Sequence, residues 1–179
     1  MKVTSLKIPQ VKLIEPEVHE DQRGYFFESF NQQKFNDAIG QQIKFVQDNH
    51  SKSIKGVLRG LHYQNDPFAQ GKLVRVVVGK VFDVAVDINK DSPTYGKWVS
   101  EILSSENKKQ LWIPEGFAHG FVVLSKEAEL LYKTTNFYSR QHEVNIHYYN
   151  NSFGINWPLE KVLLSNKDSK NIKKIILTN

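Results

Sequence analysis

The residues best suited to chemistry lie in one short stretch, residues 56–64, which reads Gly-Val-Leu-Arg-Gly-Leu-His-Tyr-Gln. Arg59 is an obligate cation, and His62 can exchange protons near neutral pH. Alternation along a strand places Gly60 on the same face as His62, where its missing side chain would leave open space, and Arg59 on the other face. We therefore predict a base and an anion clamp in a pocket wall. From this stretch alone, a strand with one hydrogen-bonded histidine is the alternative.

Further charges fall on two apolar, β-branched runs, residues 72–78 and 81–88, which are joined by a two-residue loop typical of a β-hairpin. In that hairpin Lys72, Asp83 and Asp87 share one face, and apolar side chains share the other. Charges on inner strands need partners or a wet cavity, so the charged face is interpreted as a pocket lining. A solvent-facing sheet surface is the open alternative.

Many short strands separated by turn signals must position these groups. One early helix is predicted over residues 31–39, with Asn31 as its N-cap and Gly40 as its stop. A short helix or an irregular basic tail should end the chain. The other strands are predicted at residues 2–14 (interrupted at Pro9), 25–30, 44–49, 97–103, 111–113, 117–124, 129–137 and 145–149. This pattern indicates a β-sandwich or a β-barrel.

Composition restricts the kind of protein. The 179 residues predict a single domain, residues 1–179, large enough to bury a core. No run approaches a membrane span, the N-terminus lacks the apolar block of a signal peptide, and cysteine is absent, so we expect a cytoplasmic protein without a membrane partner. The formal net charge of +5 favours anionic partners. Because no arginine-rich segment or nucleic-acid motif is present, we expect no nucleic acid among them.

A second motif, residues 114–119, reads Pro-Glu-Gly-Phe-Ala-His and resembles the second motif of the cupins, which are small jelly-roll β-barrels. Most cupins have His-x-His and a following glutamate as their first motif, and four side chains hold a metal. Here the first motif keeps His62 alone, with Gly60 where the earlier histidine would stand. Two histidines, His62 and His119, are too few for a stable transition-metal site. We therefore expect an all-β, cupin-type jelly-roll β-barrel with a few short helices, no metal and no cofactor.

Eight segments resemble one family in order and at compatible spacings: residues 21–28, 47–51, 56–64, 70–75, 81–87, 111–121, 132–134 and 164–168. The chain is similar over nearly its whole length to dTDP-4-dehydrorhamnose 3,5-epimerase, which acts on dTDP-4-keto-6-deoxyglucose in dTDP-rhamnose synthesis. The resemblance implies that Asp168 is the carboxylate partner of the base and that Tyr132 is the proton donor. A ketone at sugar C4 acidifies the C–H bonds at C3 and C5, so His62 fits the base and Lys72 suits the oxyanion at O4.

The same resemblance implies contacts with the nucleotide-sugar. Arg59 and Arg23 match positions that hold the pyrophosphate, and Tyr138 matches the residue that stacks on thymine. The family is dimeric with exchanged N-terminal strands, so a homodimer is expected. The remaining positions that resemble substrate contacts are Phe26, Glu28, Gln47, Asn49, His119, Glu143 and Lys167.

After Tyr138 the chain departs from the family pattern. The family usually has a proline-containing loop and a tryptophan-aspartate pair, whereas here Tyr148 or Tyr149 stands where the tryptophan would be. A C3-only epimerase and an epimerase of GDP-linked sugars therefore stay open as alternatives. A non-catalytic nucleotide-sugar-binding cupin and a metal-dependent cupin oxygenase are the alternatives from other classes.

Overall fold

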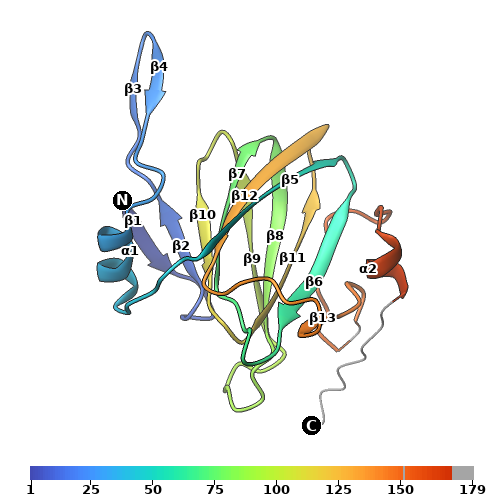
Figure 1. Ribbon diagram of the computed structural model, residues 1–179. Coiled ribbons are helices and arrows are strands. Elements are labelled where there is room, and N and C mark those ends of the chain that lie inside the picture. Colours follow the sequence, from blue (N-terminus) through green and yellow to red (C-terminus); the bar gives the residue numbers. More distant parts are fainter. Residues whose placement is uncertain (151, 171–179) are drawn as a thin grey trace.

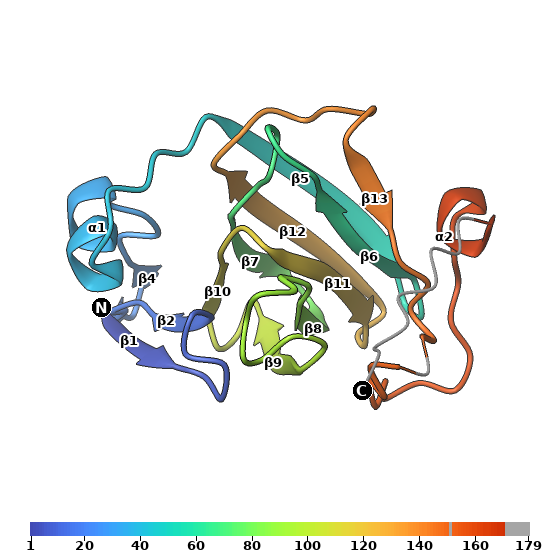
Figure 2. The same ribbon diagram turned by 90° about the horizontal axis from the view of Figure 1, so that it is seen from below.

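Two facing β-sheets form the body of the protein in the computed structural model, which describes residues 1–150 and 152–170 (Figure 1). Strand order is β1-β2-β10-β7-β12-β5 in the six-stranded sheet and β13-β6-β11-β8-β9 in the five-stranded sheet. The view from below shows the two sheets facing each other across the core (Figure 2). The expected jelly-roll fold of the cupin type is confirmed. No helix in the described part of the chain is long and apolar enough to span a membrane.

The elements have the following bounds. The six-stranded sheet contains β1 (Lys2–Ser5), β2 (Lys12–Glu15), β10 (Gln110–Ile113), β7 (Lys72–Val78), β12 (Glu127–Thr134) and β5 (Gln47–Ile54). The five-stranded sheet contains β13 (Glu143–Asn145), β6 (Leu58–Gln64), β11 (Phe117–Val123), β8 (Lys80–Asp87) and β9 (Trp98–Ser104). A separate two-stranded ribbon is made by β3 (His19–Asp21) and β4 (Gly24–Phe26), and the helices are α1 (Gln32–Ile39) and α2 (Asn166–Lys170).

The space between the sheets is apolar toward one end and polar toward the other. Val76, Val81 and Val123 belong to the main core cluster, and burying each such side chain stabilises the fold by about 1.5–3 kcal/mol. Further along the same inward faces, β7 carries Lys72 and β11 carries His119 in place of apolar side chains. The fold therefore uses one half of its interior for stability and leaves the other half for polar side chains.

The predicted early helix is confirmed as α1. The Asn31 side chain accepts a hydrogen bond from the Lys34 N–H at 3.1 Å, and Gly40 adopts the left-handed conformation with φ of 74° at the C-cap. Phe35 is buried against Trp112, with ring centroids 5.3 Å apart. Local capping and one apolar face thus fix this helix on the outside of the six-stranded sheet.

The predicted hairpin of residues 72–88 is wrong, because β7 and β8 belong to different sheets. Gly79, with φ of 76°, turns the chain from one sheet into the other. A two-residue turn signal is local and does not specify which strand becomes the hydrogen-bonding neighbour. Alternation within each strand still points Lys72 and Asp83 toward the interior, now from opposite walls.

The ends of the chain also differ from the expected pattern. Residues 2–14 form two paired strands, with Lys2 opposite Glu15 and Ser5 opposite Lys12, and not one strand interrupted at Pro9. The strands predicted at 25–30, 44–49 and 145–149 are observed as β4, β5 and β13, shifted or shortened. The predicted tail begins as α2, and its remainder lies outside the described residues.

A bulge in β6 changes the faces expected for the opening stretch. His62 pairs with His119 and Arg59 with Phe121, so three residue steps in β6 oppose two in β11. The extra residue brings Arg59 and His62 to the same cavity, and their predicted placement on opposite faces is wrong. A Cβ atom on Gly60 would lie 2.6 Å from Gly120 Cα. The β11 backbone therefore occupies the space that was expected to be open.

Replacing Gly60 with alanine should destabilise the fold strongly. Its φ of 118° costs an alanine roughly 1–3 kcal/mol, and the contact with β11 adds ~1–3 kcal/mol. Gly40→Ala is the matched control, because Gly40 has φ of 74° but no atom within 4 Å of the added Cβ, so only about 1–2 kcal/mol is lost. Urea unfolding of both variants measures the difference; equal losses would show that the close approach of β6 and β11 is not rigid.

Candidate active site

A cavity of about 220 Å³ opens at the polar end of the barrel, between the two sheets. Strands β5, β7 and β12 form one wall, and β6, β11 and β13 form the other. The lining includes nine residues singled out in the sequence, which are Gln47, Asn49, Arg59, His62, Lys72, His119, Tyr132, Tyr138 and Glu143.

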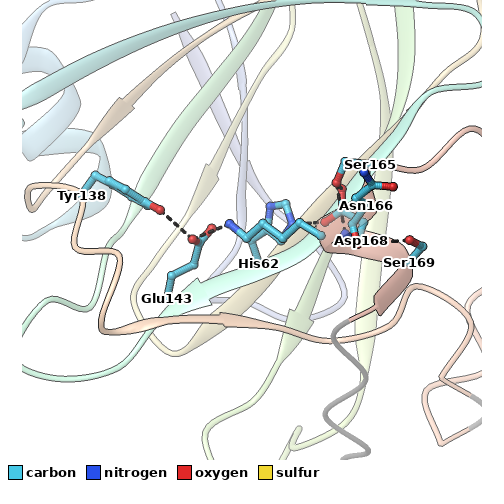
Figure 3. A network of polar contacts seen from close by, with 8 residues as sticks. His62, Tyr138, Glu143, Ser165, Asn166, Asp168 and Ser169 are labelled. Atoms are coloured by element: carbon cyan, nitrogen blue, oxygen red, sulfur yellow. Dashed lines mark hydrogen bonds and ion pairs between the residues drawn. The ribbon is translucent and has the colours of Figure 1, made fainter.

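His62 and Asp168 form a close pair at this cavity (Figure 3). The imidazole Nε2 lies 2.5 Å from Asp168 Oδ1, and the Ser165 hydroxyl donates to Asp168 Oδ2 at 2.8 Å. Burial acts to raise the pKa of Asp168, but the hydrogen bonds with His62 and Ser165 outweigh it and the pKa is lowered. The ionised carboxylate holds a proton on Nε2, which leaves the lone pair on Nδ1.

Lys72 approaches the cavity from the opposite wall, on β7. Burial lowers the pKa of its ammonium group to about 8, while the negative charges of Glu143 and Asp83 act in the other direction. At pH 7 the group is therefore still mainly charged. A desolvated cation in this position can stabilise negative charge that develops on a bound molecule.

Tyr132 lies on β12, the strand next to β7, where it pairs with Val74. Burial raises the pKa of its phenol, and the nearby positive charge of Arg59 opposes this shift. The hydroxyl is therefore protonated at neutral pH and is able to donate a proton. Because β12 and β6 belong to different sheets, Tyr132 and His62 reach the cavity from opposite walls.

His119 has a carboxylate partner of its own. Its Nε2 lies 2.9 Å and 3.0 Å from the two oxygens of Asp83, which is fully buried on β8. His119 stands directly beside His62 in the β6–β11 register. Asp83, a charged residue that was expected to need a partner on an inner strand, is therefore paired with a histidine. Within residues 1–150 and 152–170, no three His, Cys, Asp or Glu side chains gather in a way that could hold a metal ion.

Polar side chains at the rim are held in a chain of contacts. The Tyr138 hydroxyl donates to Glu143 Oε2 at 2.8 Å, and Lys167 forms an ion pair with the same oxygen. The Tyr138 backbone N–H donates to Gln47 Oε1 at 3.0 Å. Arg59 donates to the Ser53 hydroxyl at 3.0 Å. The rim therefore presents an exposed aromatic ring and a fixed guanidinium group near the opening.

Five of the sequence-predicted residues do not line the cavity of their own chain. Asp168 and Lys167 contact the lining residues His62 and Glu143, whereas the other three lie away from the site. Arg23 forms an exposed ion pair with Asp21 at the tip of the β3–β4 ribbon, which projects from the barrel (Figure 1). Phe26 is 72% exposed on the same ribbon. Glu28 is paired with Lys34 at 2.9 Å. None of Arg23, Phe26 and Glu28 lines the site around His62.

The sequence analysis missed other residues of the lining, namely Ser51, Tyr63, Gln64, Gln70 and Phe121. Alternation along β5 would have added Ser51 to Gln47 and Asn49, and alternation after His62 would have added Gln64. The Ser51 hydroxyl is buried without a hydrogen-bond partner among the described residues. Neither Tyr148 nor Tyr149, the residues of the divergent segment, lines the cavity; Tyr148 packs near Trp157.

The barrel and its polar interior define a cupin-like protein. A family model described as dTDP-4-dehydrorhamnose 3,5-epimerase matches residues 5–174. The chain therefore belongs to the dTDP-4-dehydrorhamnose 3,5-epimerase family and is an isomerase.

The similarity is high across whole chains. The dTDP-4-dehydrorhamnose 3,5-epimerase of Shigella flexneri is 64% identical over 168 residues, which is 94% of this chain and 93% of the relative. The solved epimerase of Legionella pneumophila Philadelphia 1, in complex with dTDP-4-keto-L-rhamnose, is 52% identical with a TM-score of 0.92 and covers 96% of this chain and 91% of its own. A dTDP-4-dehydrorhamnose 3-epimerase of Streptomyces niveus is 38% identical over 94% of this chain and 81% of the relative.

Replacing Lys72 with methionine should stabilise the fold at pH 7. The pKa of Lys72 is about 8 in the folded protein and 10.5 when the side chain is exposed to water in the unfolded chain, so burying the cation costs ~3 kcal/mol below pH 8. This cost disappears as the pH rises from 8 to 10.5, because the folded protein then loses its proton first. The stability advantage of Lys72→Met over wild type should shrink over the same range.

Urea unfolding between pH 7 and pH 10.5 measures this difference, with Lys80→Met at an exposed position as the control. The control should show a difference from wild type that does not change with pH. A constant difference for Lys72→Met as well would contradict the burial of a charged ammonium group.

Proposed function

We propose that this chain inverts C3 and C5 of dTDP-4-dehydro-6-deoxy-D-glucose and releases dTDP-4-dehydro-L-rhamnose, as a step of dTDP-rhamnose biosynthesis. The observation that carries the proposal is the cavity with a histidine–aspartate pair on one wall and a tyrosine and a buried lysine on the other. The dTDP-4-keto-L-rhamnose bound to the Legionella relative supports the class of ligand.

His62 acts as the base. The 4-keto group acidifies the hydrogens on C3 and C5, and Nδ1 of His62 removes one of them as a proton. The electron pair left on carbon moves into the bond to C4, and the carbonyl electrons move onto O4, which gives an enolate. Ionised Asp168 stabilises the imidazolium that forms. A positioned base of this kind contributes about 10²- to 10⁴-fold to the rate.

Lys72 and Tyr132 complete the reaction from the other wall. The Lys72 ammonium stabilises the negative charge on O4. The Tyr132 hydroxyl then gives its proton to the carbanion carbon, and O4 returns to a carbonyl. The His62 imidazolium loses its proton to solvent and the Tyr132 phenolate regains one from solvent, which resets both groups for the second carbon. Inversion requires that the proton leave one face of the sugar and return on the opposite face. The placement of His62 and Tyr132 on facing sheets supports this division of roles.

The nucleotide extends outward from the cavity. A volume of about 220 Å³ is below the roughly 300 Å³ at which small-molecule pockets begin, so it suits the hexose alone. His119 lines the sugar site, while Arg59, Gln47 and Asn49 meet the pyrophosphate and the nucleoside. Tyr138, whose side chain is 54% exposed, stacks on thymine. Glu143 and Lys167 lie beside this stacking position.

We propose a homodimer with exchanged N-terminal strands, in which Arg23, Phe26 and Glu28 serve the site of the partner subunit. Their distance from the cavity of their own chain and the projecting ribbon support this arrangement. We also propose that residues 1–179 form one domain and that the protein acts in the cytoplasm. Recovery of activity on mixing inactive His62→Ala and Arg23→Ala chains tests the exchange, and mixtures that stay inactive would contradict it.

A C3-only epimerase is the second candidate, because the Streptomyces niveus relative carries that name. The relatives described above are all named for dTDP-linked sugars, which supports dTDP over GDP.

Incubation of the purified protein with dTDP-4-dehydro-6-deoxy-D-glucose in deuterated water tests the proposal by NMR. Deuterium should enter both C3 and C5 of the product. His62→Ala should lose at least about 100-fold in turnover while its affinity for dTDP stays unchanged, because only the base is removed. Deuterium at C3 alone would identify the second candidate. Full turnover by His62→Ala would overturn the mechanism, and no incorporation by wild type would indicate a non-catalytic binding protein.

A further inference from the structure

Helix α2 carries Asp168 and is too short to hold its own position. It has five residues, and isolated helices of this length are unstable in water. Just before it, two hydrogen bonds fix the backbone of Leu163. Its carbonyl accepts from the N–H of Leu58, the first residue of β6, at 3.0 Å, and its N–H donates to the carbonyl of Gly56, just before β6, at 2.8 Å. Beyond that point, side-chain contacts must set where the helix lies and where the Asp168 carboxylate points.

Two neighbouring residues of α2 reach two neighbouring strands. Asp168 contacts His62 on β6, and Lys167 forms an ion pair with Glu143 on β13. The two strands are themselves paired, with Asn145 opposite His62. The contacts therefore close a ring that runs from β6 through α2 to β13 and back. Figure 3 shows His62 and Asp168 on one side of this network and Tyr138 with Glu143 on the other.

Glu143 is the central group of this ring. Burial acts to raise the pKa of its carboxyl, but the hydrogen bonds of Lys167 and Tyr138 outweigh it, so the pKa is lowered and the group is ionised. The same oxygen, Oε2, accepts from the Tyr138 hydroxyl and pairs with Lys167. One carboxylate thus joins the exposed aromatic ring at the rim to the helix that carries Asp168.

We propose that the Glu143–Lys167 ion pair positions α2, so that Asp168 stays on His62. The inference rests on the proposed function. It gives Lys167 a positioning role in place of a direct contact with substrate, and it adds a positioning role to Glu143, which also lines the cavity. A partly exposed ion pair adds little to stability, so its effect is on geometry. A misplacement of about 1 Å at a reacting group can reduce the rate by roughly 100-fold.

The test compares Lys167→Met with wild type. We expect kcat to fall roughly 10- to 100-fold, the dissociation constant of dTDP to stay unchanged, and the proton NMR signal of the His62 ring N–H bonded to Asp168 to broaden. Lys167→Arg should restore kcat. In an Asp168→Asn background, Lys167→Met should cause no further loss, because both changes act on the same contact. Lys109→Met, which removes an ion pair with Glu101 on β9, is the matched control and should leave all readouts unchanged.

A raised KM and weaker dTDP binding with unchanged kcat would overturn the inference and make Lys167 a direct substrate contact. A full additional loss in the Asp168→Asn background would overturn it too. A different result would contradict the proposed function, namely a His62→Ala variant that keeps its turnover. If His62 is essential and Lys167→Met retains wild-type kcat, only the positioning role is wrong.

Discussion

The contact between His62 and Asp168 is the constraint on which the rest of the site depends. It joins β6 to a helix residue that lies 106 residues later in the chain. Asp168 is only 5% exposed, and a buried carboxylate is tolerated when it is paired and hydrogen-bonded. The pair therefore fixes the imidazole tautomer and also joins α2 to β6. A change that displaces either of these affects the other.

The interior of the barrel combines two opposing requirements. Its apolar half, with side chains such as Val76 and Val123, supplies hydrophobic stabilisation. Its polar half buries Lys72 and a second histidine–aspartate pair, His119 and Asp83, which cost free energy of desolvation. Enzymes commonly keep such destabilising groups where their chemistry needs them. The fold tolerates these polar groups because side chains alternate along each strand. The inward positions can be polar while the outward positions pack in separate apolar clusters.

Features that depend on local sequence could be predicted, and features that depend on long-range pairing could not. The caps of α1 are local, and so the helix was located closely from Asn31 and Gly40. Alternation predicts which face of β7 points inward. It does not predict which strand pairs with β7, because the turn at Gly79 leads from one sheet into the other. The bulge at Gly60 arises only where β6 meets β11. The reach of Asp168 to His62 could be expected from the family resemblance alone, since no local pattern in a basic tail marks a buried carboxylate.

The central claim is that protons leave and return on opposite faces of the sugar, through side chains on opposite sheets. Incubating Tyr132→Phe with dTDP-4-dehydro-6-deoxy-D-glucose in deuterated water tests it most directly. With His62 intact and the proton donor removed, deuterium should enter the sugar without inversion, because the imidazole can return a deuteron only to the face from which it took the proton. His62→Ala should show neither exchange nor inversion. Inverted product formed by Tyr132→Phe at the wild-type rate would contradict the claim.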